Sequence, residues 1–273
     1  MFIDTTSKEA IYESLMSMLV DFTTKEEIDG LLSGDDNDLI ATWISRQVEI
    51  DEVLINHLTR RLIGTEQEKT YNLRSLLLGK NSFSNFLQKY GITFENSSNN
   101  DVNLYFRGKK FDLSNNEFLD KTQCWRLAAR LRYNEHTNYR DTCINGFCTA
   151  VNIQYDLSYV RALSYGPEFL QDLGGVFSHF GCSDDFQNMI NEYINNSRYY
   201  CIAYKVPLKE CFMDCLSTST NNYADELLKN LLEEIILVLK GMPPSLHLYI
   251  DDNANIPSSS IYKIIDLTEM AGL

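Results

Sequence analysis

The chain has 273 residues, of which 44% are hydrophobic, and a formal net charge of −14. This composition predicts a globular protein with one large domain or two of ordinary size. The surplus of acid argues against general electrostatic affinity for nucleic acid or anionic membranes, because most of the surface would repel such partners.

Targeting and membrane signals are not recognisable in the sequence. Its first residues lack the cationic flank and apolar core of a secretion signal, and no apolar run approaches the roughly 20 residues that span a bilayer. The seven cysteines have no framework-like spacing, which favours reduced thiols. We therefore expect a cytoplasmic protein with no membrane partner, or one delivered into the cytosol of a host cell.

The first 95 residues predict a helical domain. Capping boxes at Thr6-Ser7-Lys8-Glu9 and Thr24-Lys25-Glu26-Glu27 precede apolar residues at helical spacing. The same spacing predicts further helices at 39–47, 50–63, 71–78 and 83–90. His57 falls among leucines within one of these segments, and we expect it to be a structural histidine rather than a ligand or base.

After the polar run Asn96-Ser97-Ser98-Asn99-Asn100, which predicts a domain boundary, the pattern changes to mixed helix and strand. Strands are expected at 102–106, 146–153, 199–206, 246–250 and 262–267. Helices are expected at 116–133, 158–173, 186–194 and 223–240. The predicted fold class is α+β, with a helical domain over 1–95 and an α+β domain over 101–273.

Residues 103–140 form the one basic island of the chain, with eight Lys or Arg against four Asp or Glu. An apolar strand that ends at Arg107-Gly108 can present a guanidinium at a sheet edge, where it would bind a phosphate or ribose with two parallel hydrogen bonds. This pattern indicates an anion site. The alternative is that these cations lie on the solvated face of a helix and pair with surplus acid elsewhere.

Short segments of the second half resemble ADP-ribosyltransferases of the Arg-Ser-Glu type. Leu104-Tyr105-Phe106-Arg107-Gly108 resembles their first-strand aromatic-Arg-Gly motif, and Cys215-Leu216-Ser217-Thr218-Ser219-Thr220 is similar to their Ser-Thr-Ser strand. Residues 255–265 resemble the final strand of such domains, and Gly146-Phe147-Cys148 followed by 159–169 resembles the loop and helix that wall the nicotinamide pocket. The resemblance covers residues 101–273 and implies a split β-sheet domain with helices, of a divergent, toxin- or effector-like kind.

This resemblance implies a mono-ADP-ribosyltransferase that cleaves NAD and transfers ADP-ribose to a macromolecule without a metal. In that family the strand Arg holds a phosphate and ribose of NAD, the first Ser of Ser-Thr-Ser fixes the active-site strand, and an aromatic ring stacks on nicotinamide. The residues that would take these three roles here are Arg107 with Gly108, Ser217 with Thr218 and Ser219, and Tyr105 or Tyr159, respectively.

The resemblance also implies a catalytic carboxylate. It would hydrogen-bond the nicotinamide ribose and stabilise the oxocarbenium-like charge that develops as nicotinamide leaves. Glu233 and Glu234 fit this role if a strand starts there, although the periodicity favours a helix. Asp251, followed by Asp252, precedes the final motif, and His247 stands near where some relatives place their Glu.

Partners follow from the same reasoning. A protein acceptor is favoured over RNA or DNA because the chain is acidic, and a neutralising or regulatory partner could contact the helical domain. A toxin, an effector and a phage-defence component would share these features. The alternative function is a non-enzymatic protein-interaction module with a degenerate transferase-like fold, in which Ser217–Ser219 is an ordinary polar turn and helix cap.

A zinc site is not expected. The pairs Cys143 with Cys148 and Cys211 with Cys215 lack the short, matched spacing of zinc knuckles, even with His179 as a further ligand. Buried free thiols are the favoured interpretation of these cysteines.

Overall fold

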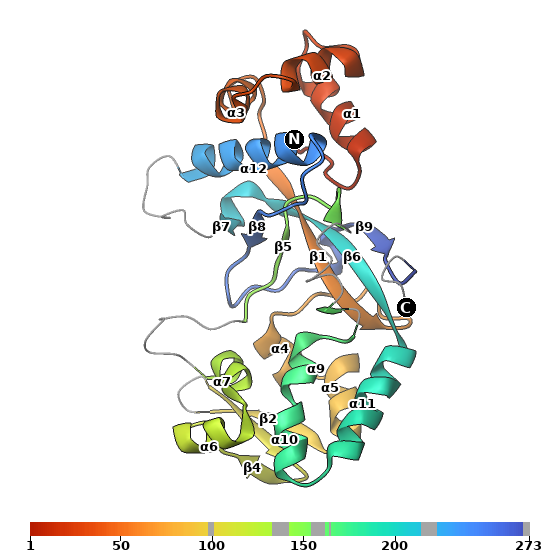
Figure 1. The fold of residues 1–273 in the computed structure, drawn as a ribbon, viewed down its shortest axis with the longest axis vertical. Coiled ribbons are helices and arrows are strands. Elements are labelled where there is room, and N and C mark those ends of the chain that lie inside the picture. The colour runs from red at the N-terminus through yellow and green to blue at the C-terminus, as the bar shows by residue number, and fades with distance from the viewer. Residues whose placement is uncertain (98–100, 133–141, 154–161, 164, 214–222, 270–273) are drawn as a thin grey trace.

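A six-stranded antiparallel sheet runs through the middle of the molecule, between an upper and a lower group of helices (Figure 1). The computed structural model describes residues 1–97, 101–132, 142–153, 162–163, 165–213 and 223–269. The sheet has the strand order β7-β8-β5-β1-β6-β9. Its strands are β1 (Glu52–Leu62), β5 (Asn145–Phe147), β6 (Ser197–Pro207), β7 (Phe212–Met213), β8 (His247–Tyr249) and β9 (Ile261–Asp266). The predicted α+β class is confirmed.

Strand β1 is the centre of this sheet, and the helix predicted over 50–63 is wrong. It pairs with β6 along its whole length, from Glu52 opposite Pro207 to Leu62 opposite Ser197. Its upper half is buried on both faces, so it reads as a continuous apolar run, which periodicity alone cannot distinguish from a helix. This segment is a strand because the backbone of β6 pairs with it and satisfies its backbone hydrogen bonds.

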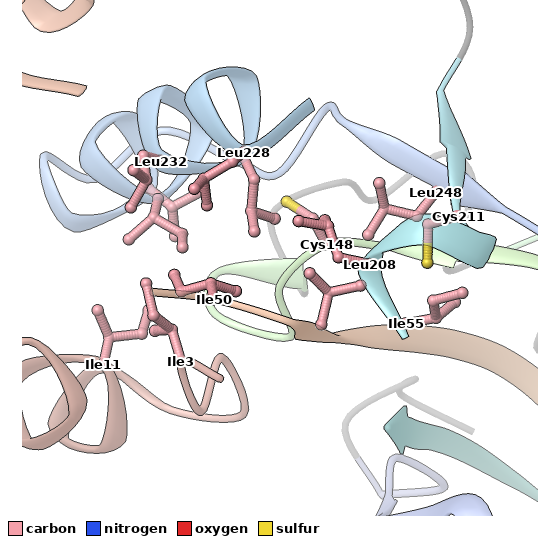
Figure 2. Close-up of a cluster of buried hydrophobic side chains, with 14 of the residues drawn as sticks. Ile3, Ile11, Ile50, Ile55, Cys148, Leu208, Cys211, Leu228, Leu232 and Leu248 are labelled. Carbon is pink, nitrogen blue, oxygen red and sulfur yellow. The ribbon is translucent and has the colours of Figure 1, made fainter. Parts of the chain in front are cut away.

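The upper group packs against one face of the sheet. It contains α1 (Lys8–Met18), α2 (Lys25–Leu32), α3 (Asn37–Ser45) and α12 (Tyr223–Leu239). The capping box at Thr24 and Glu27 is confirmed, and Ser7 caps α1. Figure 2 shows Leu228 and Leu232 of α12 facing Ile3, Ile11 and Ile50 across one buried cluster.

The lower group surrounds a second sheet of order β2-β3-β4. It contains α4 (Leu73–Leu78), α5 (Ser82–Lys89), β2 (Ile92–Asn96), β3 (Val102–Phe106), β4 (Lys109–Phe111), α6 (Asn116–Thr122), α7 (Trp125–Leu131), α9 (Glu168–Asp172), α10 (Gly174–His179) and α11 (Ser183–Asn195). Two 3₁₀ turns, η2 (Leu208–Glu210) and η3 (Ser258–Ser260), lie outside this group. The single helix predicted over 116–133 is two helices, because Gln123 adopts a left-handed conformation with φ of 56°.

Strand pairing crosses the boundary that the polar run at 96–100 predicts. Strands β2 and β3 flank that run and pair antiparallel, from Ile92 opposite Phe106 to Asn96 opposite Val102. Strand β1, from before the run, forms the centre of a sheet whose other strands all come after it. Turn-forming residues look the same in a hairpin and in a linker, so composition could not separate the two.

None of the helices in the described part of the chain combines the length and the apolar character needed to cross a membrane.

Candidate ligand-binding cavity

The predicted anchor Arg107 lies on the tight turn between β3 and β4. Arg107 and Gly108 have φ values of 50° and 76°, the left-handed pair typical of a two-residue hairpin turn. The Arg107 guanidinium is exposed, lies 2.6 Å from an Asp185 oxygen and contacts Cys182 Sγ at 3.6 Å. Its charge is therefore already paired, at a surface position.

Tyr105 lies on β3 in the same hairpin. Its hydroxyl bonds the carboxylate of Glu95, and this hydrogen bond raises the pKa of the tyrosine. The contact joins β3 to β2 across the second sheet.

The predicted catalytic glutamates lie on α12, which is a helix, as its periodicity favours. Glu234 is buried, and its carboxylate accepts hydrogen bonds from the backbone N–H and the hydroxyl of Ser245 and from the N–H of Leu246, the last at 2.9 Å. It holds the segment that leads into β8. Glu233 is half-buried on the same helix. Helix α12 and the β3–β4 turn lie at opposite ends of the molecule, so the structure does not bring these glutamates to Arg107 (Figure 1).

Asp251 follows β8 and lies in a different place again. Its exposed carboxylate accepts from the N–H of Asn253 at 2.8 Å. It lines a cavity of about 390 Å³ together with Asn255, Pro257 and Ser260 of the predicted final motif. Ser217, Thr218, Ser219 and Tyr159 lie outside the described residues.

A cavity lined by several charged and aromatic side chains lies along β1 instead. Strand β5 pairs with β1 only at Asn56 opposite Phe147. Beyond that pair, no described strand covers the edge of β1 from His57 to Leu62. A cavity of about 360 Å³ occupies this edge, closed by the 65–71 segment, α4, α5 and α9.

Arg61 forms one wall of this cavity. Its Nη1 donates to the carbonyl oxygens of Glu68 at 2.7 Å and Glu66 at 3.2 Å, and its Nη2 donates to Tyr204 Oη at 2.8 Å and to Thr70 Oγ1. All of these acceptors are neutral oxygens. No carboxylate of the described residues lies within ion-pairing distance of Arg61, so its positive charge is held in place without being neutralised.

His57 also lines the cavity, four residues before Arg61 on β1. Its Nδ1 lies 2.6 Å from the carbonyl oxygen of Asn145. Because a carbonyl only accepts, Nδ1 carries the hydrogen and Nε2 keeps its lone pair. Burial lowers the pKa of His57 to about 4, against the opposing effect of this hydrogen bond, and nearby Arg61 lowers it further. The ring is therefore neutral at physiological pH.

The lining is positive although the protein is strongly acidic. Its charged side chains are Arg60, Arg61, Lys69, Arg130, Glu68 and Glu168, a formal charge of +2 in a chain of −14. Arg130 is neutralised by Glu168 at 2.6 Å and Asp172 at 2.7 Å.

Lys69 supplies the other uncompensated charge. Its Nζ lies 5.2 Å from the ring centre of Tyr71, and no described carboxylate pairs with it. Arg61 and Lys69 thus present positive charge to the cavity from two different segments.

Arg61 is a site residue that the predicted helix over 50–63 obscures, although the sequence carries a signal for it. Arg60-Arg61 ends an apolar run just as Arg107 ends the run at 102–106. Reading 50–63 as a helix hid that likeness, because a helix has no sheet edge at which to present the guanidinium.

In the part of the chain that the structure describes, no three His, Cys, Asp or Glu side chains gather closely enough to hold a metal ion. Burial raises the pKa of the Cys201 and Cys211 thiols to about 12, so both stay protonated at neutral pH.

No protein-family model, no curated protein and no solved structure matches this chain.

Proposed function

We propose that the cavity beside β1 binds NAD and that the protein is an NAD-dependent mono-ADP-ribosyltransferase. One observation carries the proposal: Arg61 and Lys69 face the cavity with no carboxylate partner among the described residues, in a protein whose net charge is −14. Uncompensated cations in a partly enclosed site favour an anionic ligand, and the pyrophosphate of a dinucleotide has that charge. The resemblance to ADP-ribosyltransferases supplies the reaction.

The size and the walls of the cavity fit part of such a ligand. Its volume of about 360 Å³ lies at the small end of the roughly 300–1,000 Å³ typical of ligand sites. Tyr71, Phe83 and Phe169 line it, and aromatic rings are suited to packing against a base or a nicotinamide ring. We propose that one nucleoside half of NAD enters and that the rest lies toward the opening.

The proposed reaction replaces one bond at the nicotinamide ribose. The bond from C1′ to the nicotinamide nitrogen breaks, and nicotinamide leaves with the electron pair. A nucleophile of the acceptor then forms a new bond to C1′ and loses its proton to solvent. Positive charge develops on the ribose in between, so a nearby carboxylate accelerates the reaction.

Glu68 is the carboxylate that we assign to this role, in place of Glu233, Glu234 and Asp251. It lines the cavity, accepts from Ser82 Oγ at 3.1 Å and has no ion-pair partner among the described residues. The proposed acceptor is a macromolecule, with protein favoured over nucleic acid because the acidic surface would repel the latter.

The test uses the purified full chain with NAD labelled in the adenylate half, and follows binding, nicotinamide release and label on protein. We expect NAD at one hundred times its dissociation constant to stabilise the fold by about 2.7 kcal/mol. Glu68→Gln should keep binding but slow nicotinamide release about 100-fold, while Lys69→Met should weaken binding. Arg107→Ala is the matched control, since it removes an arginine from the other candidate site.

Two outcomes would contradict the proposal. If Arg107→Ala abolishes NAD binding and Lys69→Met does not, the ligand lies at the β3–β4 turn instead. If NAD neither binds nor loses nicotinamide, the enzyme proposal fails and the protein-interaction alternative takes its place.

A further inference from the structure

The segment before β1 concentrates the negative charge of the molecule. Residues 1–51 hold twelve Asp or Glu and three Lys or Arg, so this fifth of the chain carries −9 of the total −14. Among the described residues, only Asp38 (with Lys229) and Asp51 (with the N-terminal amine) of these twelve are in ion pairs. Of the other ten, nine are exposed and Asp4 is half-buried. Helices α1, α2 and α3 lie at the upper end of the molecule (Figure 1).

The same region exposes an apolar patch, formed by half-buried Phe22 with Leu39 and Trp43 of α3, and Val20 lies two residues before Phe22 in the chain. Val20, Leu39 and Trp43 are 89%, 64% and 39% exposed. Leu39 and Trp43 are one helical turn apart on α3, and the Trp43 ring packs edge-on against Phe22, with 5.9 Å between ring centres. The ring contact joins the segment between α1 and α2 to α3.

Leu39 and Trp43 lie on the outer side of α3, and contacts on its other side and at its start hold this helix in place. The other side of α3 buries Ala41 and Ile44. Lys240 of the neighbouring chain segment donates to Asn37 Oδ1 at 2.6 Å, and Lys229 of α12 pairs with Asp38. Because these contacts fix the orientation of α3, Leu39 and Trp43 stay on its solvent-facing side.

Exposed acidic residues lie next to the patch residues in the sequence. Asp21 lies between Val20 and Phe22 in the sequence, and Asp35 and Asp36 immediately precede α3; all three are exposed. Exposed aromatic and aliphatic side chains inside a charged rim are typical of protein-binding surfaces.

We propose that this surface docks a basic amphipathic segment of a partner protein, with bulky apolar side chains on the patch and Lys or Arg against the neighbouring acidic residues. Charge selects this occupant. A second copy would bring two segments of −9 together, and anionic lipid or nucleic acid would be repelled. This docking site is separate from the cavity beside β1 and does not depend on NAD.

The test measures binding of labelled 18-residue peptides to the full chain by fluorescence anisotropy. The first probe is an amphipathic helical peptide of Lys and Leu. A Glu/Leu peptide with the same spacing tests whether binding needs positive charge. A Lys/Ser peptide with the same spacing tests whether binding needs apolar side chains. We expect the Lys/Leu peptide alone to bind tightly, with weaker binding as salt is raised. Leu39→Ser with Trp43→Ser should weaken it at least tenfold, and Leu39→Ser alone should weaken it less.

Matched controls change equally exposed side chains elsewhere. Ile63→Ser with Met242→Ser, at positions 59% and 54% exposed, should alter peptide binding less than twofold. Asp21→Asn with Asp35→Asn should weaken binding, and Asp184→Asn on α11 should not.

Three results would overturn the proposal. Equal binding by the patch variant would show that overall charge alone holds the peptide. Equal binding of the Lys/Ser peptide would remove the apolar patch from the interface. Self-association of the chain that is lost in the Leu39→Ser, Trp43→Ser variant would make the patch an interface between copies. None of these results bears on nicotinamide release.

Discussion

The edge of β1 and the β3–β4 turn both place an arginine after an apolar strand, yet they treat its charge differently. Arg107 is exposed and pairs with Asp185 at 2.6 Å. Arg61 bonds only neutral oxygens of the 65–70 segment and of Tyr204. The comparison indicates that the charge of an arginine stays available to a ligand where no carboxylate pairs with it, whichever strand carries the arginine.

The largest difference is expected when each arginine is truncated. Arg61→Ala removes the donor that several partly buried acceptors share, so we expect the free energy of unfolding to fall by on the order of 3 kcal/mol. Arg107→Ala removes an exposed ion pair and should cost less than about 1 kcal/mol. Urea unfolding of both variants measures this. Equal losses of unfolding free energy would mean that the two arginines contribute equally to stability, which would contradict this prediction.

Acid should destabilise the β1 region through His57, which lines the cavity. The pKa of His57 is about 4 in the folded protein and ordinarily about 6.5. The unfolded chain therefore binds the proton first as pH falls. The stabilising contribution is complete above pH 6.5 and is lost between pH 6.5 and 4, by up to about 3 kcal/mol.

Urea unfolding at pH 7.0, 5.5 and 4.5 checks this sign. His57→Gln should flatten the loss relative to the wild type, whereas His179→Gln, at an exposed position, should leave it unchanged. An identical pH dependence in all three proteins would exclude His57 as the cause.

Glycine substitutions compare the β1–β5 contact with the hairpin turn. A Cβ on Gly146 would lie 2.7 Å from the Asn56 carbonyl oxygen in β1, so Gly146→Ala must separate the strands and should cost about 2 kcal/mol or more. Gly108→Ala meets no atom but must adopt φ of 76°, which costs about 1 kcal/mol. Thermal unfolding ranks the two. A larger loss of stability in Gly108→Ala than in Gly146→Ala would mean that β1 and β5 can separate at little cost in free energy.

The smallest expected effect concerns lysines. Lys69→Met should weaken binding of ADP-ribose about tenfold, or 1.4 kcal/mol, because it removes an uncompensated charge from the cavity wall. Lys110→Met on β4 removes an equally exposed lysine from the other region and should change affinity less than twofold. Calorimetry at low salt measures both affinities. A larger effect of Lys110 would transfer the anion site to the β3–β4 hairpin.

The sequence by itself determined the elements whose local signals agree with their surroundings. The capping box at Thr24 begins α2, and the apolar period over 223–240 gives α12. The β-branched and aromatic run at 199–206, stopped by Pro207, gives β6, and the run at 262–267 gives β9. In each case propensity, periodicity and end signals predict the same structure, so no distant contact had to decide it.

Only the tertiary structure decided β1 and the site beside it. The 52–62 segment became a strand because β6 supplied eleven residues of backbone partners. The cavity exists because β5 pairs with β1 at a single position. The charge of Arg61 is not neutralised, because the fold surrounds its guanidinium with neutral oxygens from residues 65–70 and from Tyr204. Burial, pairing and the absence of a counter-charge are properties of distant contacts, and a local sequence pattern cannot encode them.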